Sequence, residues 1–188
     1  MNKSLIILDW DNTLFPTTFV TTNKININSN KNLLSIFSEL DNLLYKLFQK
    51  ILSLADLMII TNASLSWINV SSNVLPNTRS LFPRIQIYSA RNEFQNSANM
   101  DAWKINSFKK NVNNNYQNII SIGDALFEYN ALVKLYFDNP SNKRLLKTIK
   151  LLDEPSFDKL IDQLQVIHNA ITDIVQTNSH LDLILRNK

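Results

Sequence analysis

The sequence of 188 residues predicts an α/β fold, with a doubly wound and mainly parallel sheet of about five strands and helices on both faces. Three observations support this prediction. Unbroken apolar runs recur along the chain, as is typical of strands buried on both faces. Amphipathic helical patterns separate these runs. Polar residues follow the ends of several runs, and the single glycine of the chain, Gly123, follows one of them.

The first run is Leu5–Leu8, which predicts a buried strand and is too short for a signal-peptide core. Residues 15–32 are polar for most of their length and predict a loop. From Leu33 to Leu54, apolar residues recur in steps of three and four, which predicts a long amphipathic helix packed on the core. Residues 56–64 form a second apolar run with a polar end and predict the second strand.

The middle of the chain predicts shorter elements. We expect a helix from Ser64 to about Leu75, because Pro76 cannot continue it. The turn-rich residues 76–83 lead to a third strand at 84–88, and the polar residues 92–100 predict a loop.

The last third alternates again between helices and strands. Helices are expected over 101–110 and from 125 to about 135, and strands over 118–122 and about 145–152. Ser156 can cap a final helix, which apolar spacing extends to Ile174. In the tail, three leucines alternate with other residues and can dock as an edge strand: Leu181, Leu183 and Leu185.

Strands that alternate with helices predict parallel, Rossmann-like pairing, in which the carboxyl ends of the strands share one edge. Open sheets of this kind bind ligands at that edge. Asp9 and Asp11 follow the first strand, Thr61 and Asn62 follow the second, and Asp124 follows the fourth. We therefore expect these side chains to gather at one site.

Asp9 and Asp11 alternate along the chain, so both side chains are expected on the same side. Two converging carboxylates repel unless a cation or a proton lies between them. By itself the pair predicts a magnesium-like ion, a shared proton or an acidic turn with a structural role. With the other strand-end residues and a lysine nearby, the set has the components of phosphoryl transfer.

These residues resemble the motifs of haloacid dehalogenase (HAD)-type phosphohydrolases. The first motif, Asp-x-Asp-x-Thr, is present as Asp9–Thr13, and the second, a Thr that closes an apolar strand, is present as Thr61. Lys104 is the best candidate for the lysine of the third motif. The fourth motif, Gly-Asp followed by a further acid, is present as Gly123–Asp124 with Glu128.

The motifs occur in the family's order over roughly residues 1–130. No second folded domain is evident after the first motif, so the chain resembles a small-cap or capless member of a poorly characterised branch. We expect residues 1–188 to form one HAD-like domain. Its catalytic core would cover about 1–152, with the helix and tail of 153–188 packed on it.

The resemblance implies a phosphatase that forms an aspartyl-phosphate intermediate. Asp9 would be the nucleophile and Asp11 the general acid and base. Thr61 and the backbone N–H of Asn62 would bind phosphate oxygens. Lys104 would offset the charge between Asp9 and the phosphoryl group; a solvated lysine is the alternative, with three other candidates for the role: Arg91, Lys109 and Lys110.

The resemblance also implies Mg²⁺ as cofactor. Its ligands would be the Asp9 carboxylate, the Asp11 backbone carbonyl and Asp124. Glu128 stands where the family often has Asp, and it is a weaker candidate that touches the metal through water or caps the helix start.

Other residues are expected to have structural roles. Trp10 and Trp67 are interpreted as packing residues, and the two histidines, His168 and His180, as surface residues away from the site. A basic stretch near the fifth strand is expected to be a solvated edge, with a phosphorylated macromolecule as the alternative contact: Lys143, Arg144, Lys147 and Lys150.

Composition narrows the function classes further. The net charge of +3 is small and aromatic residues do not interleave with basic ones, which disfavours a nucleic-acid-binding module. The absence of cysteine excludes thiolate chemistry, and no apolar run approaches the length of a membrane span, so we expect a cytoplasmic protein without a membrane partner. The sequence predicts a phosphorylated substrate but does not specify its chemical class or the oligomeric state of the protein. In the HAD-type family that the chain resembles, an open site often means large substrates, so the resemblance implies substrates such as phosphoproteins or nucleic-acid ends.

A catalytically silent binding or scaffolding protein with the same fold is the alternative function. The presence of Asp11 and of Gly123–Asp124 disfavours it, because a decayed site is expected to lose these residues.

Overall fold

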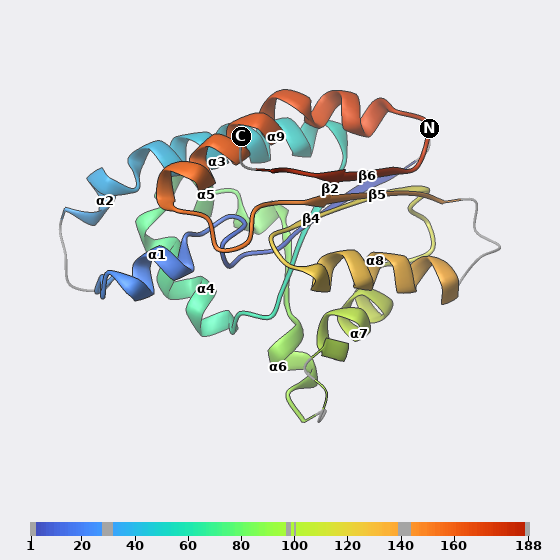
Figure 1. Ribbon diagram of the computed structural model, residues 1–188, viewed down its shortest axis with the longest axis horizontal. Coiled ribbons are helices and arrows are strands. Elements are labelled where there is room, and N and C mark those ends of the chain that lie inside the picture. The colour runs from blue at the N-terminus through green and yellow to red at the C-terminus, as the bar shows by residue number, and fades with distance from the viewer. Residues whose placement is uncertain (1–2, 28–31, 97–98, 100, 139–143, 187–188) are drawn as a thin grey trace.

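The computed structural model describes residues 3–27, 32–96, 99, 101–138 and 144–186. Within these residues the chain forms a parallel sheet of six strands in the order β3-β2-β1-β4-β5-β6 (Figure 1). The strands are β1 (Ser4–Leu8), β2 (Asp56–Thr61), β3 (Gln86–Ser89), β4 (Asn118–Gly123), β5 (Leu145–Lys150) and β6 (Leu181–Ile184). The predicted α/β class is confirmed. The sheet has six strands rather than about five because the tail pairs with β5 as an edge strand.

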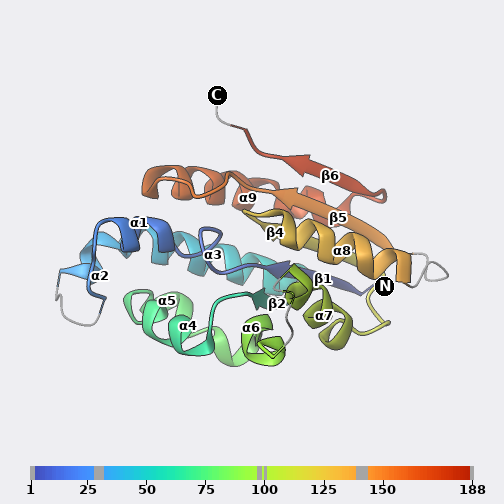
Figure 2. The ribbon, with the colours of Figure 1, turned by 60° about the horizontal axis from the view of Figure 1, so that its bottom comes forward.

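Helices connect the strands and cover the sheet. They are α1 (Thr17–Thr22), α2 (Leu33–Ile36), α3 (Ser38–Leu54), α4 (Leu65–Ser71), α5 (Pro76–Arg79), α6 (Ala90–Phe94), α7 (Asp101–Asn111), α8 (Leu126–Asp138) and α9 (Phe157–Gln176), with 3₁₀ turns at Ser72–Val74 and Phe82–Arg84. Helices α3 and α9 pack together on one face, and α7 and α8 pack together on the other (Figures 1 and 2). No helix in the described part of the chain is long and apolar enough to cross a membrane.

Strand β1 shows why its sequence is apolar without interruption. Ile6 and Leu8 belong to the core beneath α3 and α9, whereas Leu5 and Ile7 belong to the core beneath α7 and α8. All four side chains are buried, because successive residues of a strand point to opposite faces and both faces are covered.

Two predicted loops contain short helices. Helix α1 lies within the predicted loop 15–32, of which residues 28–31 are not described. At the start of this helix, the Asn12 side chain accepts a hydrogen bond from the Thr18 backbone N–H (2.9 Å). Helix α6 enters the predicted loop 92–100, of which 97, 98 and 100 are not described. Its N-cap, Ser89, accepts a hydrogen bond from the Asn92 backbone N–H (3.0 Å). Capping side chains of this kind stabilise helices that apolar periodicity alone does not reveal.

The basic stretch at β5 is not a solvated edge. Arg144 and Lys147 are buried, and Lys147 donates hydrogen bonds to the carbonyls of Ile174, Val175 and Thr177 at the end of α9. A cation at a helix C-terminus satisfies carbonyls that the helix leaves unpaired. Lys150 turns instead to Asp153 (2.6 Å) and to backbone carbonyls, and Lys143 lies outside the described residues. The prediction of a solvated stretch was therefore wrong for Arg144 and Lys147.

The strand order reverses between β1 and β4, which are neighbours in the sheet. In a doubly wound sheet this switch point leaves a crevice at the carboxyl ends of the strands. Helices α1 and α4 lie beyond the same end of the sheet (Figures 1 and 2). The fold thus places the residues that follow β1 and β4 side by side.

Candidate active site

The first acidic residue of the site lies at the switch point itself. Asp9 follows β1, and its backbone N–H donates a hydrogen bond to the carbonyl of Ile122 in β4 (3.1 Å). Its side chain continues the β1 alternation toward the α7 and α8 face and is buried. Asp124, which follows β4, is also buried.

Lys104, on α7, contacts Asp9 directly. Its ammonium donates to Oδ1 of Asp9 (2.7 Å) and to Oε1 of Glu128, and the residue is only 1% exposed. Burial disfavours the ammonium, but the two carboxylates outweigh this effect and hold the pKa of Lys104 above its usual value. The structure thus brings Lys104, the predicted lysine, to Asp9, whereas Lys109 pairs with Asp138.

The other candidates for the third-motif cation lie elsewhere. Lys110 pairs with Glu93 at 2.9 Å, and Arg91 is exposed on α6 with no side-chain partner among the described residues.

Glu128 lies in the first turn of α8 and explains the single glycine. Its carboxylate accepts from the Ala125 backbone N–H (3.2 Å) and from Lys104. A Cβ added to Gly123 would overlap the Glu128 side chain, so a side chain there would displace this carboxylate. The glycine provides room for Glu128 and does not serve a positive φ.

Thr13, the last residue of the first motif, binds Asp124. Its hydroxyl accepts from the Asp124 backbone N–H (3.0 Å) and donates to the Asp124 carboxylate (3.3 Å). Burial raises the pKa of Asp124 to about 7, and the nearby charges of Asp9 and Glu128 add to the effect. Lys104 only partly offsets the charge of these carboxylates.

This donor set is compatible with Mg²⁺. Among the residues that the structure describes, no group of three or more acidic, histidine or cysteine side chains forms a ready metal site. A magnesium site of two carboxylates, one backbone carbonyl and several waters does not require such a group. Asp9 and Asp124 offer only oxygen donors, and a divalent cation would neutralise the excess negative charge that raises the pKa of Asp124.

Asp11 is held by two residues that sequence reasoning did not assign to the site. Its Oδ1 accepts hydrogen bonds from the indole Nε1 of Trp67 (2.9 Å) and from the hydroxyl of Thr17 (2.5 Å). Burial raises the pKa of Asp11, and the nearby charge of Asp9 adds to the rise. The hydrogen bonds from Thr17 and Trp67 oppose the rise, but the pKa stays above its usual value. Trp67 also packs edge-on against Phe15 (5.8 Å), as predicted for a packing residue. Only a general rule could have indicated the contact between Trp67 and Asp11 from the sequence: a half-buried indole usually finds an acceptor for its N–H.

Trp10 is a packing residue, as expected. It is fully buried, stacks on Phe15 (6.0 Å) and donates its indole N–H to the hydroxyl of Ser71 (2.9 Å).

The second motif lies at the same edge of the sheet. Thr61 ends β2, is buried, and accepts a hydrogen bond from the Ala63 backbone N–H (3.0 Å). The side-chain oxygen of Asn62 is buried and has no partner among the described residues. The two histidines lie elsewhere, His168 on α9 and His180 just before β6.

Helix α7, which carries Lys104, is fixed by a carboxylate from α6. Glu93 accepts hydrogen bonds from Ser107 (2.7 Å), Lys110 (2.9 Å) and Asn111 (3.0 Å). Burial alone would raise the pKa of Glu93, but these hydrogen bonds outweigh it and lower the pKa below its usual value. The charged form of Glu93 therefore binds α6 to α7.

We expect Glu93→Gln to lower the free energy of unfolding by about 1 kcal/mol at pH 7. A lowered folded-state pKa contributes stability above the unfolded pKa of about 4.3, and this contribution is lost as the pH falls through the folded value. The difference from the wild type should thus shrink at acidic pH. Urea unfolding at pH 7 and at about pH 3.5 tests this, with Asp173→Asn on α9 as an exposed control. A difference that does not depend on pH would contradict the charged role of Glu93.

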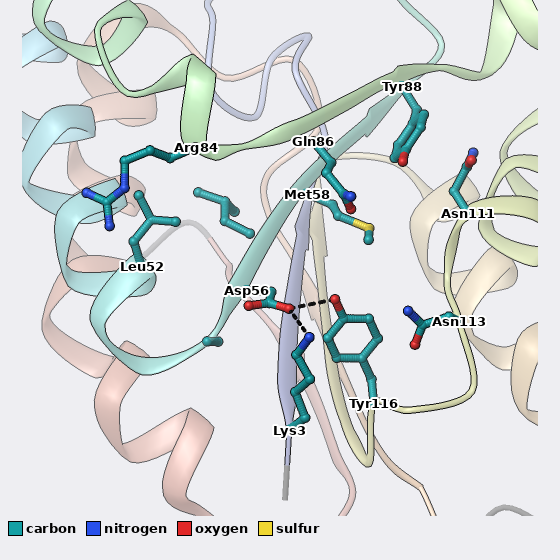
Figure 3. Close-up of a pocket in the computed structure, with 12 residues that line it drawn as sticks. Lys3, Leu52, Asp56, Met58, Arg84, Gln86, Tyr88, Asn111, Asn113 and Tyr116 are labelled. Atoms are coloured by element: carbon teal, nitrogen blue, oxygen red, sulfur yellow. Dashed lines mark hydrogen bonds and ion pairs between the residues drawn. The ribbon is translucent and has the colours of Figure 1, made fainter.

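A pocket of about 520 Å³ lies at the opposite, amino-terminal edge of the sheet (Figure 3). There Asp56 accepts hydrogen bonds from Lys3 (2.8 Å) and from the hydroxyl of Tyr116 (2.6 Å). None of the predicted site residues lines this pocket, so it is separate from the acidic site at the carboxyl edge.

No family model and no curated protein sequence matches the chain. Solved structures do. The HAD domain of the effector protein Lem4 from Legionella pneumophila is 12% identical, and the match covers 93% of this chain and 98% of that domain with a TM-score of 0.51. A protein from Burkholderia xenovorans classed as a haloacid dehalogenase-like hydrolase is 9% identical, covering 91% of this chain and 99% of that one with a TM-score of 0.41. The first match shows that the chain has the HAD-like fold, as predicted.

Proposed function

We propose that this chain with the HAD-like fold is a magnesium-dependent phosphohydrolase that acts through an aspartyl-phosphate on Asp9. The observation that carries the proposal is the state of the two aspartates after β1. In Asp9, Oδ1 is held by Lys104; in Asp11, Oδ1 is held by Trp67 and Thr17. The Oδ2 atoms of both aspartates accept no hydrogen bond from the described residues, which leaves one oxygen of each for chemistry.

In the first step, Oδ2 of Asp9 attacks the phosphorus of the substrate. The bond between phosphorus and the leaving oxygen breaks, and its electron pair goes to that oxygen, which takes a proton from Asp11 and departs as an alcohol. Lys104, fixed on the other oxygen of Asp9, stabilises the negative charge that gathers at the phosphoryl group.

In the second step, water attacks the phosphorus of the aspartyl-phosphate. Asp11, now a carboxylate, accepts a proton from this water. The bond between phosphorus and the Asp9 oxygen breaks, which restores the Asp9 carboxylate and releases inorganic phosphate. Thr61 and the backbone N–H of Asn62, which end the neighbouring strand, would bind phosphate oxygens during both steps.

Mg²⁺ would be held by the carboxylates of Asp9 and Asp124 and by the backbone carbonyl of Asp11. When bound, it would supply Lewis-acid charge to the phosphoryl oxygens. Glu128 is a weaker candidate ligand, because its carboxylate already binds Lys104 and the Ala125 backbone N–H.

The class of substrate is also proposed, from the small size of the segment between β1 and β2, where a cap domain would cover the site. Among the described residues between β1 and β2, the chain forms α1, α2 and α3 and adds no strand to the sheet. We propose phosphorylated macromolecules, either phosphoproteins or nucleic-acid ends, as the substrates to test first.

The test is phosphate release by the purified protein with Mg²⁺ from an aryl phosphate, a phosphopeptide, a 5′-phosphorylated oligonucleotide and small phosphorylated metabolites. We expect release that EDTA abolishes and Mg²⁺ restores. No release from any of these substrates would contradict the proposal. Thermal stabilisation by Mg²⁺ without release would favour the alternative of a catalytically silent binding protein.

A further inference from the structure

We propose that Trp67 is a positioning residue, which together with Thr17 orients Asp11 so that its Oδ2 atom carries the transferred proton. The inference rests on the proposed function, in which Asp11 is the general acid and base. It assigns a role to two side chains outside the sequence motifs.

Both hydrogen bonds end on the same oxygen. The indole Nε1 of Trp67 lies 2.9 Å from Oδ1 of Asp11, and the Thr17 hydroxyl lies 2.5 Å from the same atom. An indole N–H can only donate, so Oδ1 must act as an acceptor. Two donors on Oδ1 make it the poorer place for a proton, so protonation of Asp11 is favoured on Oδ2, which accepts no hydrogen bond from the described residues.

The two donors come from separate elements that are themselves fixed. Trp67 belongs to α4, whose N-cap residue Ser64 accepts its backbone N–H (3.2 Å), and its ring packs edge-on against Phe15 (5.8 Å). The position of the indole N–H therefore depends on the helix and on the aromatic core together.

Thr17 is the first residue of α1. Asn12 links the turn after β1 to this helix through two hydrogen bonds with Thr18. Its side-chain N–H donates to the Thr18 hydroxyl (3.0 Å), and its side-chain oxygen accepts from the Thr18 backbone N–H (2.9 Å). The φ of Asn12 is 54°. Asn tolerates this left-handed conformation better than most residues. The turn that carries Asp11 is thus attached to the helix that supplies its second donor.

This double attachment has a specific chemical consequence. The terminal torsion of an aspartate is broad, so a carboxylate held by no donor can present either oxygen. Two donors on Oδ1 favour the single orientation in which Oδ2 is available. Proton transfer requires an acid within hydrogen-bond distance of the leaving oxygen, so this orientation should matter most when the leaving group needs protonation.

Trp10 provides a matched control within the same region. Its indole N–H also donates to an oxygen at 2.9 Å, but that oxygen is the hydroxyl of Ser71, and its ring also packs on Phe15. Trp10→Phe and Trp67→Phe each remove one indole hydrogen bond, and only the second removes a bond to the acid.

The experiment compares kcat/KM for an aryl phosphate, whose leaving group departs readily, with kcat/KM for an alkyl phosphate, whose leaving oxygen must be protonated. The substrates are p-nitrophenyl phosphate and β-glycerophosphate. For Trp67→Phe and for Thr17→Val, we expect the aryl-to-alkyl ratio to rise by about tenfold, part of the contribution typical of a general acid. Thr17→Ser should restore the wild-type ratio, and Trp10→Phe should keep it.

The outcomes separate the inference from the proposed function. If the wild type hydrolyses both substrates and the variants lower both rates equally, Trp67 and Thr17 have only a structural role and the inference is wrong. If the wild type hydrolyses neither substrate nor any other substrate of the panel given for the proposed function, the proposed function fails and the inference fails with it; if it hydrolyses only phosphopeptides, a phosphotyrosine peptide and a phosphoserine peptide give the aryl-to-alkyl ratio. If Trp67→Phe does not fold, as judged by circular dichroism, the pair Thr17→Val and Thr17→Ser gives the same decision.

Discussion

Asp9→Asn should reduce phosphate release by about 10⁴-fold or more, because the amide cannot attack phosphorus as the carboxylate does. The fold should change little. The substitution removes one ion pair with Lys104, but it also removes a buried negative charge that raises the pKa of Asp124. Phosphate release and urea unfolding of the same preparation give both results. Unchanged turnover would contradict the assignment of Asp9 as nucleophile.

Asp41 provides a control that should behave in the opposite way. This aspartate on α3 is also buried, and it accepts the backbone N–H groups of Asn77 (3.0 Å) and Thr78 (2.8 Å) at the start of α5. Asp41→Asn leaves one of these donors without its carboxylate oxygen, so we expect a loss of about 1 kcal/mol in the free energy of unfolding. Turnover should remain, because Asp41 lies outside the acidic site.

Lys104→Met should destabilise the fold by about 3 kcal/mol at pH 7 without Mg²⁺. The substitution removes the buried ammonium that contacts both Asp9 and Glu128 and leaves their carboxylates uncompensated. The same change should also lower turnover, because the cation next to the attacking carboxylate is lost. Urea unfolding and phosphate release measure the two effects.

Two further variants make this result specific. Adding Glu128→Gln to Lys104→Met removes one of the two unpaired charges and should recover part of the lost stability. Lys109→Met changes another lysine of α7, whose partner is Asp138 and whose side chain is 40% exposed, and should have little effect. Equal stability of Lys104→Met and the wild type would contradict a charged Lys104 buried between two acids.

The positions of the acids could be predicted from the sequence. The run Leu5–Leu8 has to be buried on both faces, so its carboxyl end and the residue that follows, Asp9, had to reach the ligand-binding edge of a parallel sheet. Asp124 follows the buried run of β4 and was expected beside Asp9 for the same reason. Both predictions depend on apolar runs and on the alternation of strands with helices, which can be recognised in short segments of the sequence.

The contacts of these acids could not be predicted in the same way. Trp67 reaches Asp11 because α4 packs beside the turn after β1, 56 residues away along the chain. Gly123 has no positive φ and provides room for the Glu128 side chain, a contact that its place after an apolar run did not indicate. Lys147 is buried because the end of α9 has carbonyls that need a donor. Each of these facts depends on how helices pack on the sheet, which apolar spacing does not specify.

The most direct test of the central claim is a crystal structure of the wild-type protein with Mg²⁺ and beryllium fluoride, a mimic of the phosphoryl group. The account predicts beryllium bonded to Oδ2 of Asp9, with Lys104 still on Oδ1 and the Oδ2 of Asp11 directed toward the fluoride group. Beryllium fluoride bound at another residue, or Asp9 unmodified at saturating beryllium fluoride and Mg²⁺, would contradict it.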